Sequence, residues 1–258
     1  ILRLARQLGL VETLYANETQ PSSSSSSQQK QQVQLSVQQF EYIIVVDFEA
    51  TCWEKEAPPK WREPEIIEFP AVLLNLKTGK IESEFQQYVM PIESPKLSKF
   101  CTDLTGITQD KVDKGIPLQT ALMVFQEWLR KELKSHNLYL PKMQKDNKLG
   151  NCAFATWSDW DFERCLLREC NRKRLKKPQF FNQWIDLKSI FCRYYKYKPL
   201  NFGDALTHVG MKFEGREHCG LDDAKNIAKL AYQMTRDGAS LMITKDLAPS
   251  QLSINFAI

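Results

Sequence analysis

The spacing of apolar positions alternates between strand-like and helix-like along most of the chain. Short apolar runs predict strands over 41–50, 65–77, 80–90, 151–156 and 183–186. Apolar residues at helical spacing predict a helix that starts at Pro117 and further helices over 160–172, 201–209 and 221–234. Hairpin strands first, followed by alternating helices and strands, indicate an α/β fold with a mixed sheet flanked by helices.

The two ends of the chain have a different composition from the middle. Residues 2–14 have the spacing of a short amphipathic helix, and residues 16–39 are rich in Ser and Gln. A segment so poor in apolar residues cannot bury a core, so we expect a flexible linker there. We therefore predict an N-terminal helix and linker (1–38), one domain (39–240) and a C-terminal tail (241–258).

Composition excludes several classes of protein. The chain has 258 residues, 43% of them hydrophobic and 26% charged, which is ordinary globular usage. No apolar run approaches the roughly 18 residues of a membrane span, so no membrane partner is expected. The seven cysteines include no CxxC pair, which argues against a disulfide framework or a zinc ribbon. We therefore expect a reducing, intracellular compartment. The sequence contains no coiled coil, so we expect a monomer.

Positive charge is concentrated in one stretch of the sequence. Between residues 163 and 200 there are eleven Lys or Arg and three acids, in a chain whose net charge is only +4. Such a stretch indicates a polyanionic partner, although a solvated lysine-rich surface is the alternative. The cluster at 172–177 fits either a nuclear signal or a nucleic-acid surface, which leaves cytoplasm and nucleus both open.

Two acids interrupt the apolar run of the first predicted strand. Because side chains alternate along a strand, Asp47 and Glu49 project from the same face. Neighbouring carboxylates at the end of a buried run repel each other and resist desolvation, and a divalent cation removes both costs. Oxygen ligands favour Mg²⁺ or Mn²⁺, whereas a strand end that simply emerges into solvent is the alternative.

The last predicted helix supplies a third acid. Asp223 shares a helix face with Ile227 and Ala231, so it borders the buried side of that helix. Asp222 points about 100° away, where it suits the helix dipole. His218 lies just ahead of the helix and can reach the same pocket, or it can be an ordinary loop histidine.

A fourth acid lies at the start of the predicted helix over 160–172. Residue pattern alone does not choose between Asp159 and Asp161. Either of them could instead support the helix N-terminus, with Ser158 and Asp161 forming a capping-box-like pair.

Taken together, these motifs resemble the DEDDh 3′–5′ exonuclease superfamily, and within it the branch of RNAi-regulating and histone-mRNA 3′ exonucleases. The resemblance covers residues 40 to 240. It is carried by Asp47-Phe48-Glu49-Ala50-Thr51-Cys52-Trp53, Glu65-Ile66-Ile67-Glu68-Phe69-Pro70, Leu104-Thr105-Gly106-Ile107-Thr108-Gln109, Trp160-Asp161 and Gly215-Arg216-Glu217-His218-Cys219-Gly220-Leu221-Asp222-Asp223.

The resemblance implies a ribonuclease H-like fold and a two-metal reaction at phosphodiester bonds. It implies that Asp47, Glu49, Asp161 and Asp223 hold two Mg²⁺ or Mn²⁺ ions and that His218 is the general base. It favours Asp161 over Asp159, because the family's catalytic Asp directly follows an aromatic residue.

The resemblance also implies how a strand end is held. Phe100 and Trp160 match positions that stack on the terminal base, and Thr51 matches a position near the terminal sugar; core packing is the alternative for Phe100. The expected partners are single-stranded 3′ ends or overhangs of RNA, with DNA as a second substrate, and the expected products are 5′-mononucleotides. A DNA-directed exonuclease and a non-catalytic RNA-binding module are the competing hypotheses.

Overall fold

The computed structural model describes residues 38–54, 63–141 and 150–247. The chain divides into a unit of residues 1–35 and a unit of residues 36–258, and every described residue belongs to the second. The predicted N-terminal helix, almost all of the predicted linker and most of the predicted C-terminal tail lie outside the described residues.

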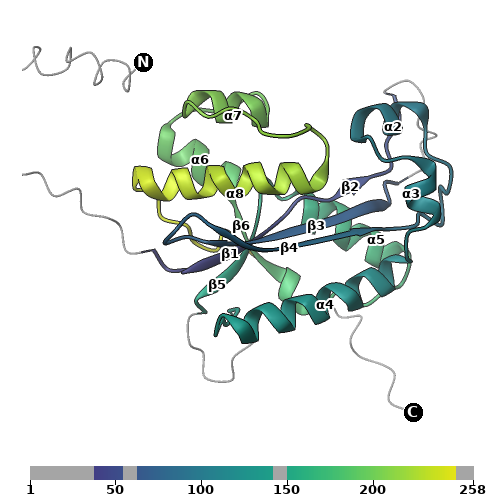
Figure 1. The fold of residues 1–258 in the computed structure, drawn as a ribbon, viewed down its shortest axis with the longest axis horizontal. Coiled ribbons are helices and arrows are strands. Elements are labelled where there is room, and N and C mark those ends of the chain that lie inside the picture. Colours follow the sequence, from purple (N-terminus) through teal and green to yellow (C-terminus); the bar gives the residue numbers. More distant parts are fainter. Residues whose placement is uncertain (1–37, 55–62, 142–149, 248–258) are drawn as a thin grey trace, which may run out of the picture. The chain divides into compact units, whose positions relative to one another are not determined.

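The described residues form one mixed sheet around β1 (Tyr42–Val46) (Figure 1). The strands lie in the order β2-β3-β1-β5-β6-β7, and β4 also pairs with β3. β1 is antiparallel to β3 and parallel to β5. The other strands are β2 (Glu49–Ala50), β3 (Ile66–Asn75), β4 (Ile81–Tyr88), β5 (Cys152–Thr156), β6 (Gln183–Asp186) and β7 (Lys245–Asp246).

Helices cover both faces of this sheet, as the predicted α/β fold requires (Figure 1). One layer contains α4 (Leu118–Ser135), η2 (Trp160–Leu166) and α5 (Leu167–Arg172). The opposite layer contains α6 (Leu187–Tyr195), α7 (Phe202–His208) and α8 (Gly220–Asp237). The remaining helices are α2 (Lys99–Thr105), α3 (Gln109–Asp113) and the short η3 (Gln179–Asn182).

The central strand shows why the sheet needs two helical layers. Ile44 and Val46 belong to the apolar cluster under α4, whereas Ile43 and Val45 belong to the cluster under α8. All four side chains are fully buried, so alternate residues of one strand fill two separate cores. None of the described helices is long and apolar enough to cross a membrane.

Several elements differ from the sequence prediction. The strand predicted over 41–50 is interrupted after Val46, and the helix predicted over 160–172 begins as the π-helical η2. The helices α2, α3 and α6 were not predicted from the sequence. The strand β7, which pairs with β6, lies within the predicted C-terminal tail. The interruption after Val46 is where the candidate site lies.

Candidate active site

Three acids from separate parts of the chain meet at the interruption between β1 and β2. Asp47 lies in the interruption, Glu49 begins β2, and Asp223 lies in the first turn of α8. One carboxylate oxygen from each lies within 4.8 Å of the others. The structure therefore brings together the three acids that strand alternation and helical spacing had singled out.

Asp161 joins this group from the opposite helical layer. It is 3% exposed, and its Oδ1 accepts a 2.8 Å hydrogen bond from the backbone N–H of Phe48. Phe48 lies between Asp47 and Glu49, so this hydrogen bond fixes the backbone that carries both of these acids. Its carboxylate binds Phe48 rather than forming the capping-box-like pair with Ser158.

Asp159 has a different environment. Its carboxylate accepts a 3.1 Å hydrogen bond from the indole Nε1 of Trp184 and forms a 2.8 Å ion pair with Lys245. Asp159 thus connects the start of η2 to β6 and β7, and its carboxylate has both a hydrogen-bond donor and a positive charge as partners there. The structure separates the two aspartates that residue pattern alone left equivalent.

Burial raises the pKa of every carboxyl in the group, and neighbouring negative charges add to this effect at Asp47, Glu49 and Asp223. Burial raises the pKa of Asp47 well above its usual value, and the charges of Asp161, Asp223 and Glu49 raise it further. The pKa of Glu49 rises to about 9, first through burial and then through the charge of Asp223. Burial raises the pKa of Asp161 and of Asp223 to about 7.

This donor set suits a divalent cation. Carboxylate oxygens from several residues converge, and the nearby charges are negative, so the ionised group lacks the positive charge that would stabilise it. Hard cations such as Mg²⁺ and Mn²⁺ bind oxygen ligands of this kind.

Glu68 is a buried acid beside this group, and the sequence alone predicted no role for it. It is 1% exposed; its Oε2 accepts the backbone N–H of Gly220 at 3.1 Å, and its Oε1 accepts Gln86 Nε2 at 2.6 Å. Its charge also raises the pKa of Glu49. Glu68 therefore holds the first residue of α8 against β3, which places Asp223 relative to Glu49. An acid inside an apolar strand run was the available signal.

Gly220 allows this close approach of α8 to the sheet. A Cβ atom added there would lie 2.9 Å from the carbonyl oxygen of Asp47 and 2.9 Å from Pro70 Cγ. Only a residue without a side chain lets the start of α8 lie this close to Asp47.

His218 lies two residues before α8, in an exposed loop. Its φ of 62° falls in the left-handed region, which non-glycine residues seldom adopt. Arg216 secures this loop: its backbone N–H binds Asp222 Oδ2 at 3.0 Å, and its Nη2 donates to the carbonyl oxygen of Asp103 at 2.9 Å. His218 is thus presented beside Asp223 by a loop tied to α8 and α2.

The three residues expected to hold a strand end differ in accessibility. Phe100 and Trp160 are 36% and 41% exposed, so Phe100 is not a core residue. Thr51 is 2% exposed, and its hydroxyl oxygen accepts the backbone N–H of Glu65 at 3.0 Å. The Thr51 side chain therefore closes the junction of β2 and β3.

The basic stretch is not a uniform surface. Lys173 is nearly buried and pairs with Glu65 at 2.7 Å and Glu169 at 2.5 Å. Lys177 is 7% exposed and donates to the carbonyl oxygen of Phe181. These lysines support the fold, so part of the cluster at 172–177 is unavailable to a partner.

Comparison with known proteins defines the class. The family model described as Exonuclease, of the RNase T type, matches residues 44–231, which include all four acids of the group and His218. The chain belongs to this family, and it is a DEDDh 3′–5′ exonuclease. The predicted family and enzyme class are confirmed.

Particular relatives make the likeness more specific. The chain is 55% identical to the 3′-5′ exonuclease Snipper of Drosophila melanogaster, over 97% of this chain and 96% of that protein. It is 46% identical to human ERI1 exoribonuclease 2 over 99% of this chain, but spans only 36% of that longer protein.

Solved structures show the same fold. The nuclease domain of 3′hExo bound to rAMP is 39% identical, with a TM-score of 0.71 over 81% of this chain and 98% of that one. The 3′-exonuclease solved for 3′-end specific recognition of histone mRNA stem-loop is 36% identical, with a TM-score of 0.71 over 82% of this chain and 89% of that one.

Proposed function

We propose that this exonuclease shortens RNA from its 3′ end, using divalent cations held by Asp47, Glu49, Asp161 and Asp223. The observation that carries the proposal is the convergence of these carboxylates, whose pKa values are all raised by burial. Relatives named as exoribonucleases, and solved relatives with rAMP or a histone mRNA stem-loop, support RNA as substrate.

The four carboxylates fit two Mg²⁺ or Mn²⁺ ions. When bound, such ions lower the pKa of an attacking water and stabilise negative charge on the leaving oxygen. The imidazole of His218 accepts the proton of that water, whose oxygen forms the new bond to phosphorus. The bond from phosphorus to the 3′-oxygen breaks, and this oxygen takes a proton from solvent. The products are a 5′-mononucleotide and a strand one nucleotide shorter with a free 3′-hydroxyl.

Phe100 and Trp160 supply sequence-tolerant contacts to the terminal base. Both rings are partly exposed, and Trp160 directly precedes Asp161. Stacking on an aromatic ring contributes about 1–3 kcal/mol per base and accepts any base. The hydroxyl of Thr51 accepts the backbone N–H of Glu65 and so supports the end of β2, the strand that carries Glu49.

The test is a time course on matched 5′-labelled RNA and DNA strands with 3′ overhangs. Wild type with Mg²⁺ should give a ladder shortened from the 3′ end on RNA, and EDTA or Asp47→Asn should remove it. Asp159→Asn is the matched control, because Asp159 pairs with Lys245 outside the acidic group. It should cut like wild type.

Two outcomes would contradict the proposal. Faster cutting of DNA than of RNA would make this a DNA-directed exonuclease. The two substrates differ in the ribose 2′-hydroxyl, which only RNA carries. Retarded strands in a gel without cutting in Mg²⁺ or Mn²⁺ would make it a binding module.

A further inference from the structure

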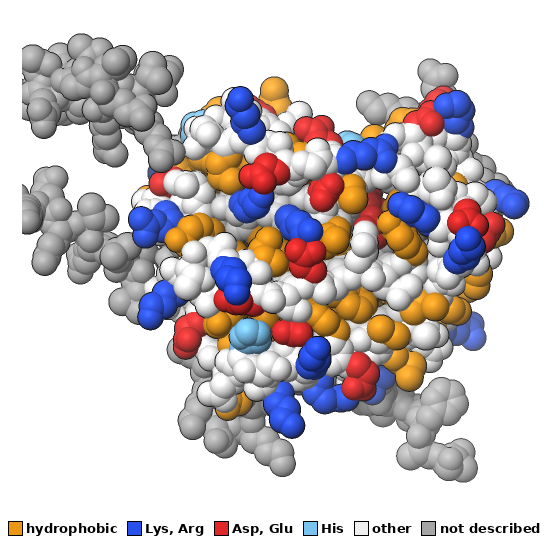
Figure 2. All heavy atoms as spheres, viewed as in Figure 1, with side chains coloured by type: hydrophobic (Ala, Val, Ile, Leu, Met, Phe, Trp, Pro, Cys, Tyr) orange, Lys and Arg blue, Asp and Glu red, His pale blue; other side chains and the backbone are white. Residues whose placement is uncertain are grey.

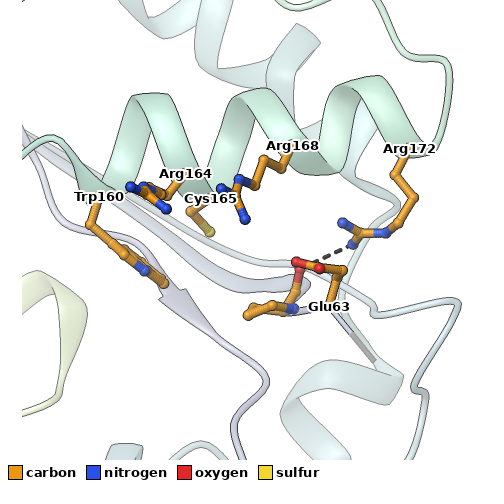
Figure 3. Close-up of a pocket in the computed structure, with 7 residues that line it drawn as sticks. Glu63, Trp160, Arg164, Cys165, Arg168 and Arg172 are labelled. Carbon is orange, nitrogen blue, oxygen red and sulfur yellow. Dashed lines mark hydrogen bonds between the residues drawn. The ribbon is translucent and has the colours of Figure 1, made fainter. Parts of the chain in front are cut away.

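A groove lies along the helix that carries Asp161. It encloses about 320 Å³, and Trp160 and Arg172 stand at its two ends. Figure 3 shows Arg164 and Arg168 projecting into it from the same side of η2 and α5, with Glu63 across from them.

Spacing explains the alignment of these side chains. Trp160, Arg164, Arg168 and Arg172 follow one another at intervals of four residues, which places them on one helix face. On α5, four residues span about 6 Å of the helix axis, at roughly 1.5 Å per residue. Cys165, 4% exposed, closes the floor between them.

The two middle arginines, Arg164 and Arg168, are not neutralised by an ion pair within the part of the chain that the structure describes. Arg164 and Arg168 are exposed and form no hydrogen bond or ion pair with any other residue that the structure describes. Arg172 is committed, because it donates to Glu93 at 2.7 Å and to the carbonyl oxygen of Pro64 at 3.0 Å. Two free guanidiniums therefore face one opposing carboxylate, that of Glu63.

This arrangement differs from the face of the molecule that Figure 2 shows. On the face shown in Figure 2, Lys and Arg side chains alternate with Asp and Glu, and the described residues there form no surface of one sign. A guanidinium presents a planar fork of donors that matches phosphate oxygens. The groove is thus a row of phosphate-binding groups beside an aromatic ring.

We propose that this groove binds the sugar–phosphate backbone of the single strand just upstream of the 3′-terminal nucleotide, with Arg164 and Arg168 contacting successive phosphates. The inference rests on the proposed function. Trp160 adjoins Asp161, at the end of the groove next to the acidic group. When the 3′ end of a strand lies at the acidic group, the strand therefore passes Trp160 and then, further upstream, the arginines. A dinucleotide, whose single phosphodiester is the scissile one, reaches neither Arg164 nor Arg168, so only longer strands gain these contacts.

The test compares R164Q/R168Q with R130Q/K134Q. The control also removes two exposed cations at an interval of four residues, but on α4 and outside the groove. The groove variant should raise KM for a single-stranded RNA 12-mer on the order of tenfold at moderate salt. It should leave hydrolysis of a dinucleotide and the thermal midpoint unchanged. The dependence of log Kd on log salt should flatten by about 1.4, from two lost phosphate contacts.

Two outcomes would overturn the proposal that this groove binds the strand. If R164Q/R168Q and R130Q/K134Q raise KM for the 12-mer equally, only net charge acts. If R164Q/R168Q loses as much activity on the dinucleotide as on the 12-mer, the arginines shape the catalytic site instead. Should wild type cut neither substrate, the proposed function fails; the 12-mer Kd and its salt slope, measured by fluorescence anisotropy, still test the groove.

Discussion

At the scale of residues, the site consists of acids placed where acids are costly. Alternation along the first strand predicted that Asp47 and Glu49 share a face, and helical spacing predicted that Asp223 turns inward; the structure brings all three together. Asp161 could not be separated from Asp159 by pattern, because the difference lies in distant partners, Phe48 for one and Lys245 for the other.

His218 gives the residue-scale prediction. His218→Gln should lower kcat about 10²–10⁴-fold while divalent cation binding is retained, because the imidazole accepts a proton and is not among the ligands. Wild-type kcat should fall toward acid pH, since an imidazole that already carries the proton cannot accept another. Initial rates on RNA between pH 5 and 8 measure both effects.

His136→Gln is the matched control for this prediction. His136 follows α4; its ring lies 5.5 Å from the ring of Tyr42, and its Nε2 lies 3.5 Å from Glu132 Oε2, outside the active-site group of acids. It should keep the wild-type rate and pH profile. A flat wild-type profile down to pH 5, or a loss under tenfold in His218→Gln, would remove the general-base role.

At the scale of elements, the predicted strands were right where local pattern decides and wrong where tertiary contacts decide. The interruption after Val46 depends on the bond from Phe48 to Asp161, 113 residues away, which no window of sequence contains. The pairing of β7 with β6 is equally non-local. By contrast, α6 had a local signal: Asp186 caps it by accepting the Ser189 N–H at 2.9 Å.

The start of α8 gives the element-scale prediction. Gly220→Ala should push α8 away from the sheet, because the new Cβ would lie 2.9 Å from the carbonyl oxygen of Asp47. Asp223 would then separate from Asp47, so kcat should fall at least about tenfold and the thermal midpoint should drop. Single-turnover rates and thermal unfolding measure the two effects.

Gly203→Ala controls for the loss of a glycine in a helix. A Cβ at Gly203 would meet its nearest neighbours at 3.5 and 3.8 Å, which is ordinary contact. Its activity should match wild type. Equal activity of Gly220→Ala and Gly203→Ala would show that the close approach of α8 to the sheet does not determine the position of Asp223 relative to Asp47.

At the scale of the whole molecule, the cation site opposes folding when no cation is bound. The folded protein raises the carboxyl pKa of Glu49 from 4.5 to about 9, and of Asp161 and Asp223 from 3.8 to about 7, chiefly by burial. Between these values the folded state binds more protons than the unfolded state, so stability falls as pH rises.

This linkage gives the whole-molecule prediction. In EDTA, the free energy of unfolding should drop on the order of 2 kcal/mol or more between pH 5 and 9, and 10 mM Mg²⁺ should recover much of that loss. Urea unfolding at several pH values measures it. A stability difference between Mg²⁺ and EDTA that stays constant or narrows as pH rises would contradict the prediction.

The central claim is that the four carboxylates form a divalent cation site, and calorimetric titration with Mn²⁺ at pH 7 tests it most directly. In two buffers of different ionisation enthalpy, wild type and Asp159→Asn should bind Mn²⁺ and release protons, because cation binding ionises carboxyls of raised pKa. Asp47→Asn should bind more weakly and release fewer protons. Equal binding by wild type and Asp47→Asn, or binding without proton release, would contradict the account.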